Sequence, residues 1–434
     1  MEIKPVKGAH DVIRDEASDY NRIEEALIRI AEVYAYEEFR TPVLEHTELF
    51  TRSVGDSSDI VRKEMYTFLD KGGRSLTLRP EVTASIIRTI VNNKLYANQD
   101  FPIKAYYLGP VFRYERPQAG RYRQFSQFGI EAVGLDSPLI DVEAIALGYN
   151  CLKALKLEDI TLKINTLGDE ESRNNYREAL RRYFEGHITN MCPDCQERLK
   201  LNPLRILDCK VESDREIIKS APRIHDYLSI ASKDRFDKTV NLLDSLGIKF
   251  DIDESLVRGL DYYSEVVFEY HFISSSGQTL GALGGGGHYS ELVSEIGGPS
   301  LVGVGLSFGV ERLVQVVASE KSLPDYASFV TFYVMPVGNV ELEKVYEINE
   351  KLRRFGYPTE MSYEIKPLKT LFKKAERRNA LFAVLIGEDE IKNDTLTLKN
   401  LRTQEQTTVA MGDIERVVDQ MIYEVLQAID EEEK

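Results

Sequence analysis

The sequence predicts an α+β protein built in three parts, and three observations carry this prediction. Two apolar segments between residues 103 and 133 are separated by a loop that holds proline and glycine, which is typical of an antiparallel hairpin. Residues 170–250 are charged and mostly helical in their apolar spacing. Strand and helix patterns alternate from residue 328 onward, which indicates an α/β domain with a mixed or mainly parallel sheet. We therefore expect one domain over 1–169 and 251–322, a helical insertion over 170–250 and a last domain over 328–434.

Local patterns place the elements within these parts. Helical spacing predicts helices over 18–38 and 82–95, and a third over 310–318. Strands are expected at 104–109, 111–115, 124–133, 265–272, 280–283 and 301–308. Residues 321–327 have the composition of a linker. Beyond it we expect strands at 329–335, 357–363, 381–387, 395–399 and 406–410, and helices at 341–355, 367–379 and 413–429.

Composition and charge exclude several classes of protein. Of the 434 residues, 43% are hydrophobic and 29% are charged, which fits a soluble globular protein and not a disordered one. No apolar run approaches the roughly 20 residues that span a bilayer, and the first residues lack the apolar core of a secretory signal. The net charge of −16 disfavours indiscriminate binding to nucleic acid, although clustered basic residues could still bind a specific RNA. We expect a cytoplasmic protein.

The hairpin carries the strongest local signal for chemistry. Alternation places Arg113 and Glu115 on one face of their strand, and Phe125, Gln127 and Glu131 on one face of the next. Arginine suits a phosphate, a carboxylate suits an amine or imidazolium, and an aromatic ring offers a stacking surface for a base. The alternative is a solvated polar sheet face, and these residues alone leave both interpretations open.

The loop between these strands is basic. Arg116, Arg121 and Arg123 lie within eight residues that hold no carboxylate. Basic residues interleaved with polar and aromatic ones fit the end of a nucleic acid or a polyphosphate. A generic charged loop would normally mix both signs of charge.

Glycine-rich and turn-forming segments supply further candidates. Glu81 and Thr83 fit the first turn of a helix, where a simple helix start is the alternative interpretation. The four glycines at 284–287 would let a ligand approach the backbone closely, and they lack the Gly-Lys-Ser/Thr of a Walker phosphate loop. Gly303 and Gly305 would clear room for a flat ring on one strand face. Arg312, in the first turn of the next helix, indicates an anionic ligand nearby.

Five motifs in order resemble those of a known family. Phe112-Arg-Tyr-Glu with its loop, and the segment from Gly305 to Arg312, resemble motifs 2 and 3 of the class II aminoacyl-tRNA synthetases. Arg40-Thr-Pro42 resembles their motif 1. The segment from Arg258 to Tyr263, and Gly-Gly-Gly-X-Tyr289, are similar to the two histidine-specific motifs of the histidyl-tRNA synthetases. The order and spacing match over nearly the whole chain.

This resemblance implies a fold, a reaction and partners. It implies a class II catalytic domain with an antiparallel sheet and an inserted helical domain, followed by an α/β anticodon-binding domain. The implied reaction joins histidine to ATP, with Mg²⁺, to give histidyl-adenylate and pyrophosphate, and then transfers histidine to the 3′-terminal adenosine of tRNA(His). No tightly bound cofactor is expected. The family forms homodimers, and Pro42 matches the interface proline.

The resemblance also assigns roles to the candidate residues. Arg113 and Arg258 would act on the α-phosphate as the catalytic residues. The ATP-binding set would be Arg113, Glu115, Phe125 and Arg312, which would hold the α-phosphate, the adenine amino group, the adenine ring and the γ-phosphate in that order. The histidine-binding set would be Glu81, Thr83 and Gln127 for the α-amino and carboxylate groups, and Glu131, Tyr263 and Tyr289 for the imidazole.

A second hypothesis belongs to a different class of protein. A non-catalytic, synthetase-like paralogue that senses histidine typically lacks the last domain and has eroded ATP motifs. Here Arg113, Arg258 and Arg312 are in place and the last domain is present, which favours the enzyme. His288 stands where the family pattern usually has arginine, and Val82 where it has glycine.

Two remaining clusters allow two interpretations each. Cys192-Pro-Asp-Cys195 resembles half of a zinc site that Cys209 and His187 could complete, but only one such pair is present, so we expect ordinary thiols and no metal. Lys369, Lys373 and Arg377 would line one face of a helix opposite Leu368, Leu371 and Ala375. That basic face is either solvated or contacts tRNA together with Arg116, Arg121 and Arg123.

Overall fold

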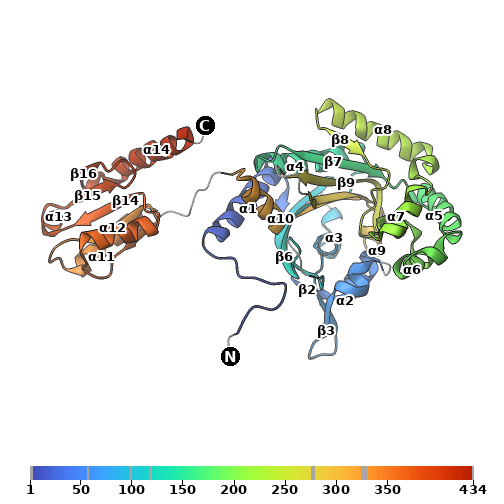
Figure 1. The fold of residues 1–434 in the computed structure, drawn as a ribbon, viewed down its shortest axis with the longest axis horizontal. Coiled ribbons are helices and arrows are strands. Elements are labelled where there is room, and N and C mark those ends of the chain that lie inside the picture. The colour runs from blue at the N-terminus through green and yellow to red at the C-terminus, as the bar shows by residue number, and fades with distance from the viewer. Residues whose placement is uncertain are drawn as a thin grey trace. The chain divides into compact units, whose positions relative to one another are not determined.

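The chain forms two compact units (Figure 1). The computed structural model describes residues 3–55, 58–97, 100–116, 120–274, 279–323 and 330–432. The first unit includes residues 19–323 and the second residues 324–434. Part of the expected linker, residues 324–327, lies outside the described residues. No helix among the described residues is long and apolar enough to cross a membrane.

An eight-stranded sheet forms the centre of the first unit. Its order is β1-β5-β6-β11-β10-β9-β7-β8, and its inner pairs are antiparallel, while β1–β5 and β7–β8 are parallel. In that order the strands are Glu37–Glu38, Ile103–Phe112, Gln124–Val133, Gly303–Gly309, Thr279–Tyr289, Tyr263–Ile273, Ile160–Thr166 and Phe250–Ile252. A small sheet of order β2-β4-β3 lies apart from it, with strands Leu44–His46, Ser75–Leu78 and Tyr66–Leu69.

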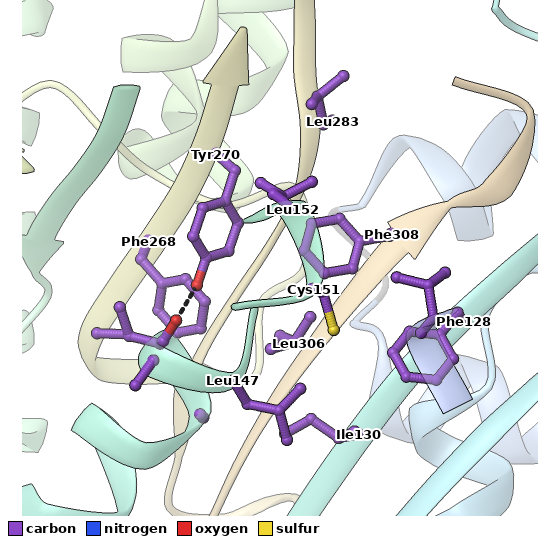
Figure 2. Close-up of a cluster of buried hydrophobic side chains, with 14 of the residues drawn as sticks. Phe128, Ile130, Leu147, Cys151, Leu152, Phe268, Tyr270, Leu283, Leu306 and Phe308 are labelled. Carbon is purple, nitrogen blue, oxygen red and sulfur yellow. Dashed lines mark hydrogen bonds between the residues drawn. The ribbon is translucent and has the colours of Figure 1, made fainter. Parts of the chain in front are cut away.

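The two faces of the large sheet differ because side chains alternate along each strand. One face is apolar and packs on helices α1 (Asp15–Val33), α4 (Pro138–Ala154) and α10 (Val310–Glu320). Figure 2 shows this core, in which Phe128 and Phe308 lie with Leu147 and Cys151 of α4, and the Tyr270 hydroxyl donates to the Ile145 carbonyl at 2.5 Å. This packing fixes the strands against the helices. The opposite face holds a second apolar cluster, which includes Ile103, Val133 and Val267, beside the buried polar groups Gln127 and Glu131.

The first unit contains further helices besides α1, α4 and α10. They are α2 (Thr47–Ser53), α3 (Thr83–Asn92), the π-helix η1 (Ile60–Glu64), the 3₁₀-helix η2 (Leu95–Ala97) and α9 (Leu292–Glu295). The stretch expected to be helical contains α5 (Glu170–Glu185), α6 (Pro193–Leu201), α7 (Glu212–Lys219) and α8 (Ile230–Ser245), with 3₁₀-helices η3 (Ile188–Asn190), η4 (Pro203–Asp208) and η5 (Ile224–Tyr227). A separate cluster that includes Tyr176, Leu180, Phe184 and Ile206 forms its own small core.

The second unit has a mixed five-stranded sheet, as its β/α alternation predicted. The order is β13-β12-β14-β15-β16; the first three strands are parallel and the last two antiparallel. The strands are Thr359–Met361, Phe332–Pro336, Phe382–Ile386, Thr395–Asn400 and Gln406–Ala410. The helices are α11 (Leu342–Arg354), α12 (Leu368–Arg377), α13 (Glu388–Asn393), the 3₁₀-helix η6 (Met411–Asp413) and α14 (Ile414–Glu432).

Several boundaries differ from the sequence-based expectation. Helix α1 ends at Val33 and not at residue 38, because Ala35 adopts a left-handed φ of 59° and Tyr36 turns into the core. Strand β10 does not end at residue 283 as expected but continues through the four glycines at 284–287, since β9 and β11 pair with them on both sides. Strands β7 and β8 and helix α13 were not predicted.

Candidate active site

Several residues on the face of the sheet opposite α4 are glycines, which have no Cβ atom. Longer side chains lie in the space that the missing Cβ atoms leave. A Cβ on Gly305 would be 2.0 Å from the Glu131 carboxylate, and one on Gly303 would be 2.4 Å from the Tyr289 ring. A Cβ on Gly287 would approach the Tyr263 ring to 2.9 Å. Strands β6, β11 and β10 therefore form a floor on which one carboxylate and two tyrosines lie flat.

Gly303 and Gly305 were expected to clear room for a flat ring. The protein's own Tyr289 ring lies over Gly303, and the Glu131 carboxylate lies over Gly305. The glycines shape the site indirectly, by setting how low these two side chains lie.

Glu131 is the carboxylate at the centre of this floor. It is 1% exposed, accepts the Thr83 hydroxyl at 2.6 Å, and accepts the Tyr289 hydroxyl at 2.9 Å. Burial raises the pKa of Glu131 to about 8, against the lowering effect of these two hydrogen bonds. The Glu131 carboxyl group therefore holds a proton near neutral pH until a cationic group binds in place of that proton.

Two further buried polar groups belong to the same face. Glu81 precedes α3 and accepts the Ala84 N–H at 3.0 Å through Oε1, while its Oε2 has no hydrogen-bond partner among the described residues. The Oε1 of Gln127 on β6 is equally buried and without a partner there. Burial raises the pKa of Glu81. Buried polar atoms left in this state are costly, so a ligand with donor groups would satisfy both.

Arg258 lies on a neighbouring part of the same face. A Cβ on Gly285 would come within 3.0 Å of its guanidinium, which pairs with Glu269 of β9 and lies 5.7 Å from the centre of the Tyr263 ring. Burial opposes the charge, but the Glu269 carboxylate outweighs it and raises the pKa of Arg258. Its buried Nε has no partner among the described residues. The Arg258 guanidinium therefore places a positive charge beside the floor.

The loop that carries Arg258 is held from the helical insertion. Asn202 donates to the Asp261 carboxylate at 3.0 Å, and Arg205 pairs with the same carboxylate at 2.9 Å. Asp261 is thus fixed by the end of α6 and by η4, only three residues beyond Arg258.

The hairpin places the other predicted residues at its open end. Strand β5 ends at Phe112, although the Arg113 N–H still pairs with the Arg123 carbonyl at 2.9 Å. The Arg113 Nε donates to the Pro80 carbonyl at 2.9 Å, and its guanidinium lies 5.3 Å from the centre of the Phe125 ring. Arg113 and Phe125 therefore meet as alternation predicted.

Glu115 is placed by a turn and not by strand alternation. Its N–H donates to the Arg113 carbonyl at 2.8 Å, while the Tyr114 N–H donates to the Glu64 carbonyl at 2.7 Å. The expectation that Glu115 shares a strand face with Arg113 is wrong for this reason. The Glu115 carboxylate pairs with Arg121 at 3.3 Å.

Arg312 projects from the first turn of α10 toward the same hairpin. Its Nε donates to the Gly120 carbonyl at 3.3 Å, and its guanidinium also donates to the Ala282 carbonyl. Burial lowers the pKa of Arg312, and the nearby Arg121 lowers it further. The neighbouring positive charges of Arg312 and Arg121 favour the binding of an anion between them.

The remaining predicted residues are not part of the floor. Pro42 and Arg116 are exposed, and Arg123 stacks on Tyr114, with 3.8 Å between guanidinium and ring centre. On α12 of the second unit, three exposed basic residues follow one another at four-residue spacing: Lys369, Lys373 and Arg377. Leu371 and Ala375 are buried opposite them as expected, but Leu368 is 37% exposed, because it begins the helix.

Sequence reasoning missed several residues that support the site. Glu269 could have been predicted from the sequence, because alternation along β9 places it on the same face as Val267. Val267 is the residue of β9 that lies opposite Gly287. Behind the floor, His288 Nδ1 lies 3.0 Å from the buried Asp141, which also pairs with Arg235 at 2.6 Å. The apolar neighbours of Asp141 near the start of α4, such as Ile140 and Val142, were the available signal for a buried carboxylate.

Comparison with known proteins decides the family. The family model described as histidyl-tRNA synthetase matches residues 8–313, and the one described as anticodon binding domain matches residues 331–421. The chain belongs to the histidyl-tRNA synthetase family.

Relatives and solved structures agree with this assignment. The histidine–tRNA ligase of Bacillus licheniformis is 46% identical over 413 residues, covering 94% of this chain and 97% of the relative. That of Listeria innocua is 47% identical over 411 residues, covering 94% and 96%. The apo histidyl-tRNA synthetase of S. aureus superposes with a TM-score of 0.81 at 35% identity, covering 96% of this chain and all of the other.

The raised pKa of Glu131 predicts how stability depends on pH. The ordinary value is 4.5 and the folded value is about 8, so within this window the folded protein keeps a proton that the unfolded chain has released. Stability should therefore fall as pH rises from 5 to 8, by an amount on the order of 3 kcal/mol for this group. Glu131→Gln should remove that contribution, as measured by urea unfolding at several pH values. Glu158→Gln, at an exposed position, is the matched control; equal slopes for both variants would contradict the prediction.

Proposed function

We propose that the chain is an ATP-dependent ligase that attaches histidine to tRNA(His). Histidine and ATP give histidyl-adenylate and pyrophosphate, and the 3′-hydroxyl of the terminal adenosine then takes the histidyl group and releases AMP. The curated relatives named as histidine–tRNA ligases, which align over nearly the whole chain, support this activity. One observation carries the substrate: a glycine floor on which the buried carboxylates pair with no cation among the described residues, flanked by three arginines.

The floor suits histidine. The side chains of Glu131, Tyr289 and Tyr263 bind the imidazole ring. The N–H groups of the ring then occupy the position that the proton of Glu131 holds in the free protein. The unpartnered oxygens of Glu81 and Gln127 accept the α-amino group, and the Thr83 hydroxyl completes this side. The raised pKa of Glu131 favours imidazole over a fixed cation such as lysine, since the ring and the carboxyl group share one proton.

The arginines suit ATP. Arg113 binds the α-phosphate, Phe125 stacks on adenine, and Glu115 accepts from the adenine amino group. Arg312 binds the γ-phosphate at the open end of the hairpin. Arg258 supplies charge at the α-phosphate as the carboxylate of histidine attacks it. Because phosphoryl and nucleotidyl transfer leaves little covalent work for the protein, position and charge account for the rate.

Mg²⁺ enters this scheme as part of the ATP substrate. Burial raises the pKa of Glu64, and the neighbouring Glu115 carboxylate raises it further. The Glu64 carboxylate would fit a divalent cation held by the ATP phosphates.

The remaining assignments concern organisation and partners. We assign residues 1–169 and 251–322 to catalysis, 170–250 to the helical insertion, and 328–434 to anticodon binding. Acceptor-end contacts come from Arg116, Arg121 and Arg123, and anticodon-stem contacts from the basic face of α12. The protein works as a cytoplasmic homodimer with Pro42 at the interface, an exposed position in the isolated chain.

Histidine-dependent exchange of pyrophosphate into ATP tests this function. The purified protein should catalyse exchange with histidine and with no other standard amino acid. Background exchange at saturating histidine, with histidine binding retained, would overturn the ligase and support the histidine-sensing paralogue. Loss of both exchange and binding would contradict the assignment of the floor as well.

A second prediction separates catalysis by Arg258 from its ion pair. Arg258→Ala should lower the exchange rate by about 10²-fold or more while histidine and ATP bind nearly as before, because the lost charge acts on the transition state. The substitution also leaves the half-buried Glu269 carboxylate without Arg258, so that His271 is its remaining partner among the described residues. The double variant Arg258→Ala/Glu269→Gln should therefore regain thermal stability but not rate. Recovery of rate in the double variant would show that Arg258 has only a structural role.

A third prediction concerns α12. Replacing Lys369, Lys373 and Arg377 together with alanine should raise KM for tRNA and flatten its salt dependence, by roughly 0.7–0.9 in log–log slope per lost phosphate contact. Exchange without tRNA should not change. The matched control replaces Lys344, Lys351 and Arg354, three exposed basic residues of α11. If both triple variants charge tRNA like wild type at every salt concentration, the α12 face is merely solvated.

A further inference from the structure

Three cysteines and one aspartate meet in the helical insertion, away from the floor. Cys192 immediately precedes α6, and Cys195 lies in its first turn. Cys209 follows η4, and Asp214 lies in the first turn of α7. One ligand atom from each of these four residues lies within 4.8 Å of all the others.

The distances match a tetrahedral metal site. With zinc–sulfur and zinc–oxygen bonds of about 2.3 and 2.0 Å, tetrahedral geometry places two sulfurs about 3.8 Å apart, and a sulfur and an oxygen about 3.5 Å apart. The Cys192 and Cys209 sulfurs are 3.8 Å apart, and the Cys209 sulfur is 3.3 Å from Asp214 Oδ2. The four side chains are therefore already positioned to bind one ion without moving the backbone.

The charge of Asp214 supports the same conclusion. This side chain is fully buried, and no Lys, Arg or His pairs with it among the described residues. Its partners are the Cys192 N–H at 3.1 Å, the Cys209 thiol at 3.3 Å and the Ser213 hydroxyl at 3.4 Å. A buried carboxylate is costly without a cation, and here three sulfurs surround the place that a cation would fill.

We propose that Cys192, Cys195, Cys209 and Asp214 bind one structural Zn²⁺ ion. Sulfur-rich tetrahedral sites select zinc among the common divalent ions, and four protein ligands leave no open position for catalysis. This proposal differs from the expectation of ordinary thiols. His187, considered as the fourth ligand from the sequence, packs against Tyr183 instead, and Asp214 takes its place.

The ion would join three short helices of the insertion. It would connect α6, the end of η4 and the start of α7 around the small core that includes Ile206 and Leu199. From the same helices, Arg198 pairs with Asp59 at 3.1 Å and Arg205 pairs with Asp261 at 2.9 Å. The zinc ion would thus stabilise the base from which the insertion holds the loop of Arg258.

Metal analysis of the full-length protein tests the proposal directly. Protein purified under reducing conditions without a metal-affinity step should contain about one zinc ion per chain by mass spectrometry. Co²⁺ in place of zinc should give the visible absorption of tetrahedral thiolate ligation. Cys195→Ser and Asp214→Asn should lose most of the zinc. The matched control Cys151→Ala removes a cysteine buried in the core of Figure 2 and should keep it.

Measurements on the unmodified protein keep the test decisive if a variant fails to fold. A chelator should make three additional thiols reactive and lower Tm, and added zinc should reverse both changes. Two results would overturn the proposal. One is less than about a tenth of an ion per chain with no shift of Tm on adding zinc to the reduced protein. The other is a disulfide between Cys192 and Cys209 in protein isolated with its thiols protected from oxidation.

Discussion

The absence of Cβ atoms along neighbouring strands is the constraint on which the site depends. Backbone at Gly305 lies directly beneath the Glu131 carboxylate, and a methyl group there would overlap it. The strands can come this close to their own side chains because their opposite face is fixed by large apolar residues such as Phe128 and Phe308, packed on α4. The core thus sets the height of the floor, and the floor sets the position of Glu131, Tyr263 and Tyr289, which would touch the imidazole of histidine.

Burial then gives the carboxylates of this face their chemical character. Glu131 and Glu81 are both shielded from water, which raises the pKa of each. Arg258 is buried as well but keeps its charge, because Glu269 pairs with it from β9. In the proposed function, protonated or poorly satisfied acids would meet the amino acid, and a permanent positive charge would lie beside the phosphate that reacts.

Much of this could be predicted from the sequence, for physical reasons that are local. Strand alternation placed Gln127 and Glu131 on one face, and helix periodicity placed the basic residues of α12 on one side. Glu115 was misplaced because a single turn after β5 breaks the alternation. Asp214 lies close to the three cysteines because of the way in which α6, η4 and α7 pack, and no spacing in the sequence reveals such packing.

Histidine binding by Gly305→Ala tests most directly the claim that the glycine floor creates the histidine site. The added methyl group must displace the Glu131 carboxylate, so the Kd for histidine measured by calorimetry should rise by roughly 10- to 100-fold, the cost of a lost hydrogen bond to a charged group. Gly186→Ala, where the nearest atom to an added Cβ is 3.5 Å away, should bind histidine like wild type. Unchanged affinity in a correctly folded Gly305→Ala protein would contradict the account.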